Sequence, residues 1–258
     1  MQKVKAKKSL GQHFLTDRNI AKKIVDSLKQ DNCKTIVEIG PGTGVLTKML
    51  LQSTKPFFAI EIDQESIDFL KNEFPEKNFL VEGDVLKIDF SQFDAPLAII
   101  GNFPYYISSQ IFFKALENKN AVNELVCMIQ KEVAQRIASP PGNKTYGILS
   151  VLLQTYFDIE YLFTVHEHCF SPAPKVKSAV IRLKRNNREN LNCDEKLFFR
   201  VVKQSFNQRR KTLRNSLKNI CLNLDGQSEM LAKRPEQLSV DEFIELTAAI
   251  ETSNQKTM

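Results

Sequence analysis

The chain has 258 residues, 42% of them hydrophobic, which is enough apolar material for one full α/β core and a smaller second unit. A formal net charge of +6 and an isoelectric point of about 9.0 favour a polyanionic partner over an acidic one. No apolar stretch is long enough to span a bilayer, the lysine-rich start lacks the apolar segment of a secretory signal, and the five cysteines include no Cys-x-x-Cys pair. We therefore expect a soluble, cytoplasmic protein with reduced thiols and no membrane contact.

The amino-terminal part leads from a basic segment to a glycine-rich loop. Its cations are Lys3, Lys5, Lys7 and Lys8. This segment is either an arm that clamps RNA or a disordered tail. Periodic apolar residues predict a helix over residues 18–28, and the β-branched run 35–39 predicts a strand. The strand leads into residues 40–44 (GPGTG), where glycines permit positive φ and let a ligand lie against the backbone.

Further strands are predicted to end beside this loop. The apolar runs that predict them cover residues 57–62, 78–82 and 97–101. Glu61 ends the second strand about 20 residues after Gly40, a spacing that suits a carboxylate bonded to ribose hydroxyls. Asp84 follows the third strand, where it can accept from an adenine amine, and Asn102 follows the fourth. Because Val45 stands where a dinucleotide fingerprint has Gly or Ala, these strand ends predict a pocket for an adenosine-like cofactor without a pyrophosphate.

Residues 102–105 (NFPY) predict a turn that holds a flat base by its amino group. An exocyclic adenine amine is a poor nucleophile because its lone pair is delocalised into the ring. If the Asn102 side-chain oxygen and a backbone carbonyl both accept from the amine, its lone pair turns toward an electrophile. Pro104 fixes φ and has no donor of its own, and Tyr105 offers a face to a flipped-out base. The alternative is a strand and a Pro-Tyr turn without chemistry.

The second half of the chain completes the sheet and then becomes helical. A strand is expected over residues 122–129, helices over 131–138 and 147–156, and an antiparallel strand pair over 159–165 and 176–183. The asparagine-rich stretch 184–194 is the expected linker, and helices follow it. In residues 166–169 (HEHC), two imidazoles and a thiol are compatible with a metal, but no second ligand pair is visible, so we expect surface histidines and no metal.

The positive charge is concentrated between residues 196 and 220. This segment holds eight cations and no acid: Lys196, Arg200, Lys203, Arg209, Arg210, Lys211, Arg214 and Lys218. Apolar residues recur through it at helical spacing and predict a basic amphipathic helix. Such a helix can also be a solvated face or lie on a membrane surface. Because arginine suits phosphate geometry, we favour contact with an RNA backbone. The RNA contacts we expect are Arg209, Arg210, Lys211 and Arg214.

Five segments of the chain resemble one family of enzymes. They are residues 11–15 (GQHFL), 38–44 (EIGPGTG), 102–105 (NFPY), 170–176 (FSPAPKV) and 208–215 (QRRKTLRN). Together they resemble the small-subunit ribosomal RNA adenine N6,N6-dimethyltransferase family, known from kasugamycin sensitivity. The resemblance spans nearly the whole chain. It implies a Rossmann-like class I S-adenosylmethionine-dependent methyltransferase sheet with a small C-terminal all-helical domain. We expect a catalytic, S-adenosylmethionine-binding domain over residues 1–186 and a helical RNA-binding domain over residues 187–258.

The resemblance also implies the reaction and its partners. Methyl groups would pass from S-adenosylmethionine to N6 of two adjacent adenosines near the 3′ end of small-subunit (16S) rRNA. The substrate would be an immature ribosomal subunit, and we expect the enzyme to be a monomer. The implied donor contacts are His13, Leu15, Gly40, Glu61, Asp84 and Asn102.

The expected mechanism is direct attack of the adenine amine on the sulfonium methyl of the donor. Asn102 orients the amine, Tyr105 stacks on the base beside Pro104, and Phe170 stacks on the other face of the base. After one methylation the amine keeps a single N–H, so one acceptor contact is given up during the second transfer.

Two positions depart from the family pattern. His13 stands where many members have Asn, so this contact becomes sensitive to protonation. Phe103 stands where most members have Leu or Ile. Its larger ring leaves less room for a second N-methyl group, so Phe103 bears on how many methyl groups are transferred.

Other functions fit parts of the pattern. A large-subunit rRNA adenine N6-methyltransferase of the macrolide-resistance type shares the sheet and the turn, and residues 208–215 argue against it. A non-catalytic RNA-binding assembly or transcription factor would have a vestigial pocket, which the intact strand-end residues argue against. A nucleotide-dependent oxidoreductase is disfavoured by Val45 and by the lack of a catalytic acid or base near the strand ends.

Overall fold

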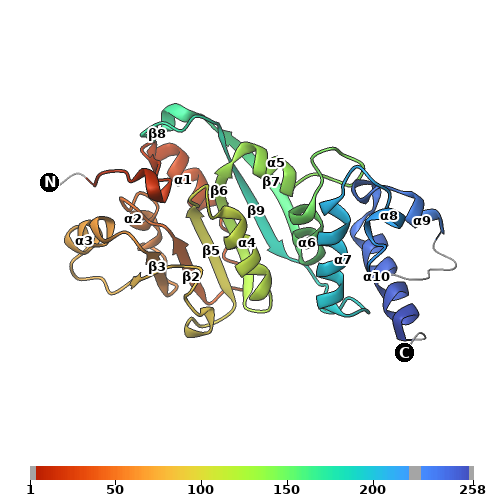
Figure 1. Cartoon of the computed structure of the whole chain (residues 1–258). Helices are drawn as coiled ribbons and strands as arrows, with labels where there is room; N and C mark the ends of the chain where they lie inside the picture. Colours follow the sequence, from red (N-terminus) through yellow and green to blue (C-terminus); the bar gives the residue numbers. More distant parts are fainter. Residues whose placement is uncertain (1–3, 221–227, 256–258) are drawn as a thin grey trace. The chain divides into compact units, whose positions relative to one another are not determined.

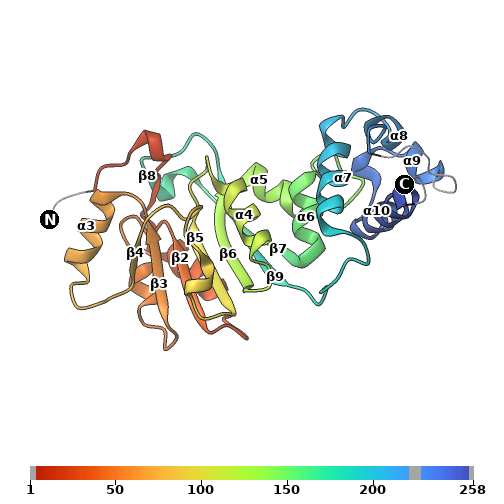
Figure 2. The same ribbon diagram turned by 60° about the horizontal axis from the view of Figure 1, so that its bottom comes forward.

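The chain folds into two compact units. A computed structural model describes residues 4–220 and 228–255, so Lys3 lies outside the described residues (Figures 1 and 2). The first unit contains residues 1–134 and 158–185, and the second contains residues 135–157 and 186–258. Within the described ranges, no helix has both the length and the apolar character that a membrane crossing needs. The described cysteines are free thiols: Cys33, Cys127, Cys169 and Cys193.

The first unit is built on a seven-stranded sheet. Its strand order is β4-β3-β2-β5-β6-β9-β7. The strands are β2 (Thr35–Ile39), β3 (Phe57–Glu61), β4 (Leu80–Glu82), β5 (Leu97–Asn102), β6 (Val122–Gln130), β7 (Phe157–Val165) and β9 (Ser178–Arg185). Neighbours from β4 to β6 are parallel, and β9 is antiparallel to β6. After β4 the chain returns to β5 on the other side of β2. The carboxyl ends of β2 and β5 therefore flank a topological switch point, where open α/β sheets bind ligands.

Helices cover the sheet because its central strands are apolar on both faces. Every residue of β2 is buried, and so are the apolar residues of β5. The helices and turns of this part are η1 (Lys8–Leu10), α1 (Arg18–Ser27), α2 (Thr47–Leu50), α3 (Gln64–Glu73), η2 (Phe90–Gln92), α4 (Ser108–Glu117) and η3 (Glu167–Cys169). Helix α5 (Lys131–Ile137) begins in the first unit and ends in the second. Asp17 caps α1 by accepting from the N–H groups of Asn19 and Ile20, which starts the helix where the sequence predicts it. Ala21 and Ile24 of α1 are buried in the core cluster of the sheet.

A two-stranded sheet holds the amino-terminal segment in place. β1 (Phe14–Leu15) pairs antiparallel with β8 (Phe170–Ser171), with Leu15 opposite Phe170. Residues more than 150 positions apart in the sequence are thereby brought together, as the register of Phe14 with Ser171 shows. The pairing fixes residues 11–15 near the end of β5.

The second unit is helical. It contains α6 (Ile148–Tyr156), α7 (Glu195–Asn207), α8 (Leu213–Ser216), α9 (Ser228–Ala232), η4 (Pro235–Gln237) and α10 (Val240–Gln255). Asp194 caps α7 by accepting from the Leu197 N–H at 2.6 Å. Helices α6, α7 and α10 contact one another, and Phe198 and Phe243 are fully buried between them.

The structure confirms the predicted fold class and changes two details. Residues 135–157, which the sequence pattern placed in the catalytic part, belong to the second unit, because the largely buried α6 packs on α7 and α10. The first unit ends at Arg185, next to the expected boundary at residue 186. The basic segment 196–220 is helical in two pieces: α7 ends at Asn207, and a turn separates it from α8.

Candidate active site

A cavity lies at the carboxyl ends of the parallel strands. Its walls are the amino-terminal segment 10–15, the glycine loop after β2, the end of β3, the segment after β4 and the turn after β5. Of the predicted site residues, the cavity is lined by His13, Leu15, Gly40, Glu61, Asp84, Asn102, Pro104 and Tyr105. The structure therefore brings together in one place the four residues predicted from strand ends and the two donor contacts, His13 and Leu15, that the resemblance implies.

The glycine loop after β2 has three residues in the left-handed region of φ, which glycine adopts without strain. Gly40, Gly42 and Gly44 have φ values of 68°, 54° and 73°. A Cβ at Gly42 would also lie 2.9 Å from the Phe14 ring. The Gly42 N–H donates to the Glu61 carboxylate at 3.1 Å. The loop thus presents bare backbone to the cavity and is tied to the strand that carries the acid.

Glu61 is held by the backbone around it. Its Oε1 accepts from the N–H groups of Ile62 and Asp63, each at 2.9 Å, and its Oε2 accepts from Gly42. Burial raises the pKa of Glu61, and these backbone donors oppose the rise. The carboxylate therefore has a fixed orientation at the cavity wall, where its remaining lone pairs can accept from ligand hydroxyls.

Glu38 is a second carboxyl at this wall, and its chemistry was missed in the sequence. It is 1% exposed, and its Oε2 accepts from the Thr47 hydroxyl at 2.7 Å. Burial raises the pKa of Glu38 to about 8, and the nearby charge of Glu61 adds to the rise. Glu38 is therefore largely neutral at pH 7. Motif spacing gave its position but carried no information about its desolvation.

Replacing Glu38 by Gln is expected to change how stability depends on pH. The pKa of Glu38 is raised from 4.5 to about 8 in the folded protein, so the folded state holds an additional proton between these pH values. The stability of the parent protein should fall by up to about 1.4 kcal/mol per pH unit across that window through this group alone. Glu38→Gln removes this dependence. The thermal unfolding midpoint of the variant, measured relative to that of the parent, should therefore be higher at pH 8 than at pH 5. An exposed control, Glu117→Gln, should follow the parent at both.

The turn after β5 carries an Asn102 amide that is held by the backbone of the amino-terminal segment. The Asn102 Nδ2 donates to the His13 carbonyl at 2.9 Å. Because a carbonyl can only accept, the amide group facing it must be the NH₂, which leaves the side-chain oxygen as the free acceptor. The Phe103 carbonyl accepts no hydrogen bond from the residues that the structure describes, so it is the second candidate acceptor.

Tyr105 and His13 form an anchored aromatic pair beside this turn. Their rings stack with centroids 5.6 Å apart. The Tyr105 hydroxyl lies 2.6 Å from the Ser178 hydroxyl of β9, and His13 Nδ1 lies 2.8 Å from the Pro172 carbonyl. His13 Nδ1 must carry the proton in that contact, because the carbonyl only accepts. The Tyr105 ring is therefore held in one orientation at the cavity.

Two predicted aromatic residues have buried rings. Phe170 is 5% exposed, belongs to the core cluster beneath β1, and is not among the residues that line the cavity. Its apolar ring is buried because β8 pairs with β1. Phe103 borders the cavity, but its ring is 1% exposed and packs edge-on against Phe112 with centroids 6.1 Å apart. An exposed aromatic that the sequence did not single out, Tyr106, also lines the cavity and is 55% exposed.

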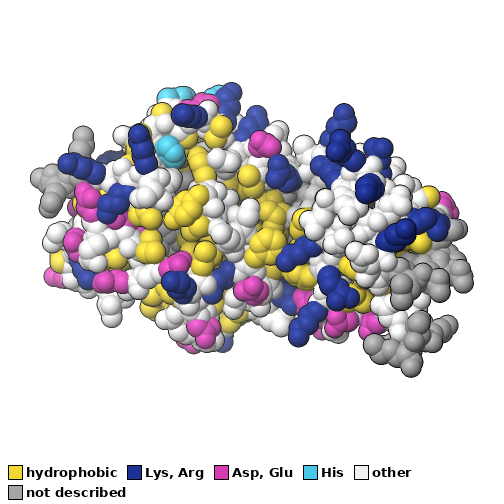
Figure 3. All heavy atoms as spheres, in the orientation of Figure 1, with side chains coloured by type: hydrophobic (Ala, Val, Ile, Leu, Met, Phe, Trp, Pro, Cys, Tyr) yellow, Lys and Arg dark blue, Asp and Glu magenta, His cyan; other side chains and the backbone are white. Residues whose placement is uncertain are grey.

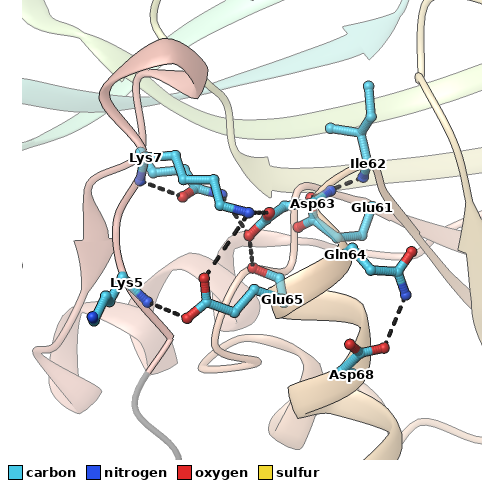
Figure 4. A network of polar contacts seen from close by, with 10 residues as sticks. Lys5, Lys7, Glu61, Ile62, Asp63, Gln64, Glu65 and Asp68 are labelled. Carbon is cyan, nitrogen blue, oxygen red and sulfur yellow. Dashed lines mark hydrogen bonds and ion pairs between the residues drawn. The ribbon is translucent and has the colours of Figure 1, made fainter.

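The amino-terminal lysines do not behave as a free arm. Lys7 forms an ion pair with Asp63, and the Lys5 N–H donates to Glu65 at 2.9 Å (Figure 4). Gln12 donates to the second Asp63 oxygen at 3.3 Å. Of the two alternatives left open, the described part of the segment does not fit a disordered tail, since it is docked on Asp63 and Glu65. Contact of its exposed cations with RNA stays a prediction.

The four predicted RNA contacts lie together in the second unit. Arg210, Lys211 and Arg214 are exposed, whereas the Arg209 Nε lies 3.8 Å from the Glu236 carboxylate. Figure 3 shows Lys and Arg side chains on the visible face of this unit.

The two histidines of residues 166–169 form a pair of their own. His166 and His168 stack on each other with centroids 5.8 Å apart, and the described ranges contain no group of three or more potential metal ligands.

The comparison with protein families identifies the family to which the chain belongs. The family described as Ribosomal RNA adenine dimethylase matches residues 3–249. The chain belongs to this family. It is an S-adenosylmethionine-dependent rRNA adenine dimethyltransferase, and the readings as an oxidoreductase or as a non-catalytic factor are discarded.

Individual relatives agree with the family assignment. The chain is 57% identical to "Ribosomal RNA small subunit methyltransferase A" of Cytophaga hutchinsonii, covering 96% of this chain and 98% of that protein. It is 54% identical to the protein of the same name from Parabacteroides distasonis, with 96% and 94% covered. Among solved structures, a dimethyladenosine transferase from Plasmodium falciparum is similar with a TM-score of 0.78 and 26% identity, covering 95% of this chain and 99% of that one. The 23S rRNA methyltransferase ErmE is 23% identical with a TM-score of 0.68, which shows a shared fold alone.

Proposed function

We propose that the enzyme transfers methyl groups from S-adenosylmethionine to N6 of two adjacent adenosines near the 3′ end of small-subunit rRNA, giving N6,N6-dimethyladenosine. The observation that carries the catalytic part is the Asn102 amide, whose NH₂ is engaged by the His13 carbonyl and whose oxygen is left to accept. The small-subunit substrate is supported by the names of relatives that are 57% and 54% identical. The fold does not distinguish it from the large-subunit alternative, because ErmE shares the fold.

The residues around the cavity fit the donor. We infer that the bare backbone at Gly40 lets the methionine part approach closely, that Glu61 accepts from the ribose hydroxyls, and that Asp84 accepts from the adenine amine. His13 and Leu15 close the cavity from the amino-terminal side. When bound, S-adenosylmethionine supplies an electrophilic methyl group on its sulfonium. The donor has an adenosine moiety and no pyrophosphate, in keeping with the loop at Val45.

The turn after β5 then handles the target base. The Asn102 side-chain oxygen and the Phe103 carbonyl each accept a hydrogen bond from one N–H group of the adenine amine. These two hydrogen bonds turn the lone pair of the amine toward the methyl group. Tyr105 stacks on the base, and its ring needs no reorganisation because His13 and Ser178 already hold it. Each transfer would form an N6–CH₃ bond as the S–CH₃ bond breaks, leaving S-adenosylhomocysteine, and the methylated nitrogen would release one proton to solvent. After the first transfer only one N–H remains, so one of the two acceptors is released. We do not include Phe170, since its ring is buried in the core.

Methylation products test this function. The protein is incubated with labelled donor and with small ribosomal subunits that lack the modification, and the RNA is then digested and analysed by mass spectrometry. We expect N6,N6-dimethyladenosine at two adjacent positions near the 3′ end. A product on large-subunit RNA would favour the ErmE-like alternative, and no product on either would contradict the proposal. The same assay with mature and immature subunits tests the proposed preference for an immature particle.

The second unit is proposed to hold the RNA backbone, with the enzyme acting as a cytoplasmic monomer. The support for the first part is the exposure of Arg210, Lys211 and Arg214, whereas Arg209 is partly engaged by Glu236. The support for the cellular context is the family resemblance. Exposed cations bind polyanions by displacing counterions, so the contribution of this surface should depend strongly on salt.

The combined variant Arg210→Ala, Lys211→Ala and Arg214→Ala is expected to weaken RNA binding and to lower the slope of log affinity against log salt by about 2 to 3. Donor affinity, measured by calorimetry, should stay unchanged. The matched control removes three cations that are ion-paired with protein acids: Lys22 with Asp26, Arg188 with Asp241 and Lys233 with Glu242. If both triple variants change the salt slope equally, net charge rather than this surface governs RNA binding.

A further inference from the structure

The segment from residue 4 to residue 15, called here the amino-terminal strap, is fixed beyond β3 mainly at Asp63, with a second contact at Glu65, which accepts the Lys5 N–H at 2.9 Å. Asp63 is 2% exposed, and its carboxylate receives Lys7 and Gln12 from the strap and the Ser66 hydroxyl from α3 (Figure 4). Asp63 is the N-cap residue of α3, yet its side chain accepts no capping N–H. An N-cap Asp ordinarily accepts from the first helical turn. Here that carboxylate is used to hold the strap.

The ion pair at Asp63 persists at neutral pH. Burial alone would raise the pKa of Asp63, but hydrogen bonds from Lys7, Ser66 and Gln12 outweigh it and leave the pKa below its ordinary value. The bond to Asp63 raises the pKa of Lys7. The Asp63 side chain is 1% exposed and that of Lys7 is 41% exposed. Loss of Lys7 would therefore leave a buried carboxylate without its cation, which is more costly than breaking an exposed pair.

The same residue is bonded to the donor-binding carboxylate. The Asp63 N–H donates to Glu61 Oε1 at 2.9 Å. Glu61 also accepts from Gly42 of the glycine loop. A displacement of Asp63 is therefore passed through one hydrogen bond to the group that we assign to the ribose hydroxyls. Figure 4 shows Lys7, Asp63 and Glu61 in this succession.

The other end of the strap reaches the catalytic turn. Gln12 is tied back to Lys7, because its side-chain oxygen accepts the Lys7 N–H at 2.9 Å. The next residue, His13, orients Asn102 through its carbonyl and stacks on Tyr105 through its ring. Through Asp63 at one end and His13 at the other, the strap thus links Glu61 to the Asn102 amide that faces the target amine.

We propose that Lys7 and Gln12 are positioning residues of the donor site: by docking the strap on Asp63 they hold Glu61 and the Asn102 amide in their working orientations. This goes beyond the reaction itself and gives a lysine of the basic amino terminus a role in donor binding. It rests on the assignment of the cavity as the donor site.

The test compares two lysines of the strap. Lys8 is exposed, and its ammonium group makes no ion pair within the described residues, so Lys8→Ala removes the same charge without touching Asp63. Donor affinity is measured by calorimetry with S-adenosylmethionine, and RNA affinity is measured separately. We expect Lys7→Ala to weaken donor binding about tenfold, Lys8→Ala to leave it unchanged, and Lys7→Arg to restore most of it. Both alanine variants should weaken RNA binding to the same small extent.

Further measurements separate the outcomes. A thermal melt shows whether Lys7→Ala is folded, and rescue by Lys7→Arg keeps the test valid if it is not. Normal donor affinity in Lys7→Ala, or equal losses in Lys7→Ala and Lys8→Ala, would overturn the proposal. A parent protein that binds no S-adenosylmethionine would instead contradict the donor site itself.

Discussion

Asn102→Ala is expected to lower the rate of methyl transfer about 10²- to 10³-fold, the usual loss when one oriented polar group at the reacting centre is removed. The physical reason is that the amide oxygen, left free by the bond from Nδ2 to the His13 carbonyl, is needed to turn the lone pair of the amine toward the methyl group. Donor affinity should fall much less, because Glu61 and the glycine loop remain. Single-turnover methylation of unmodified small subunits and calorimetry with S-adenosylmethionine measure the two effects.

A control with the same kind of bond makes this result specific. Asn123 also donates from its side-chain amide to a backbone carbonyl, that of Asp31 at 2.8 Å, but it does not line the cavity. Asn123→Ala should therefore methylate at the parental rate. Asn102→Asp keeps an acceptor but cannot donate to His13, so it should be slower than the parent although it still bears an oxygen. Methylation at the parental rate by Asn102→Ala would show that the amide plays no part in the reaction.

Gly101→Ala is expected to destabilise the first unit by about 3 kcal/mol. A Cβ at Gly101 would lie 2.4 Å from the Ile39 carbonyl oxygen and 3.2 Å from the Phe103 ring. The first of these atoms belongs to the backbone of a neighbouring strand and has no rotamer with which to move away. Since β2 carries the glycine loop and β5 carries Asn102, separating them should also weaken donor binding.

Thermal or urea unfolding measures the effect of Gly101→Ala, and Gly147→Ala is its control. At Gly147 the nearest atoms to an added Cβ are 3.9 Å away, and its φ of −159° is ordinary extended backbone. Gly147→Ala should therefore unfold within about 1 kcal/mol of the parent. Equal unfolding midpoints for Gly101→Ala and the parent would contradict this prediction, because they would mean that β2 and β5 can accommodate a methyl group at residue 101 without loss of stability.

Most of the residues that line the cavity at the strand ends could be predicted from the sequence, because their positions depend on local order. Parallel strands are short apolar runs, and their carboxyl ends meet at one edge of the sheet. Each strand could therefore be recognised by itself, and the residue that follows it could be placed at the site. Gly40, Glu61, Asp84 and Asn102 all line the cavity for this reason.

The features that could not be predicted depend on which distant segments pack together. Phe170 is buried where β8 pairs with β1. Lys7 forms its ion pair with Asp63 because the strap crosses to the loop after β3. The ionisation of Glu38 depends on its burial and on the charge of Glu61. Desolvation and contacts between residues far apart in the chain leave no mark in local composition or periodicity. The sequence by itself thus determined which strands build the site and which residues follow them. Only the tertiary structure decided which aromatic, cationic and acidic groups reach the site and whether the acidic ones are ionised, because these depend on contacts and burial.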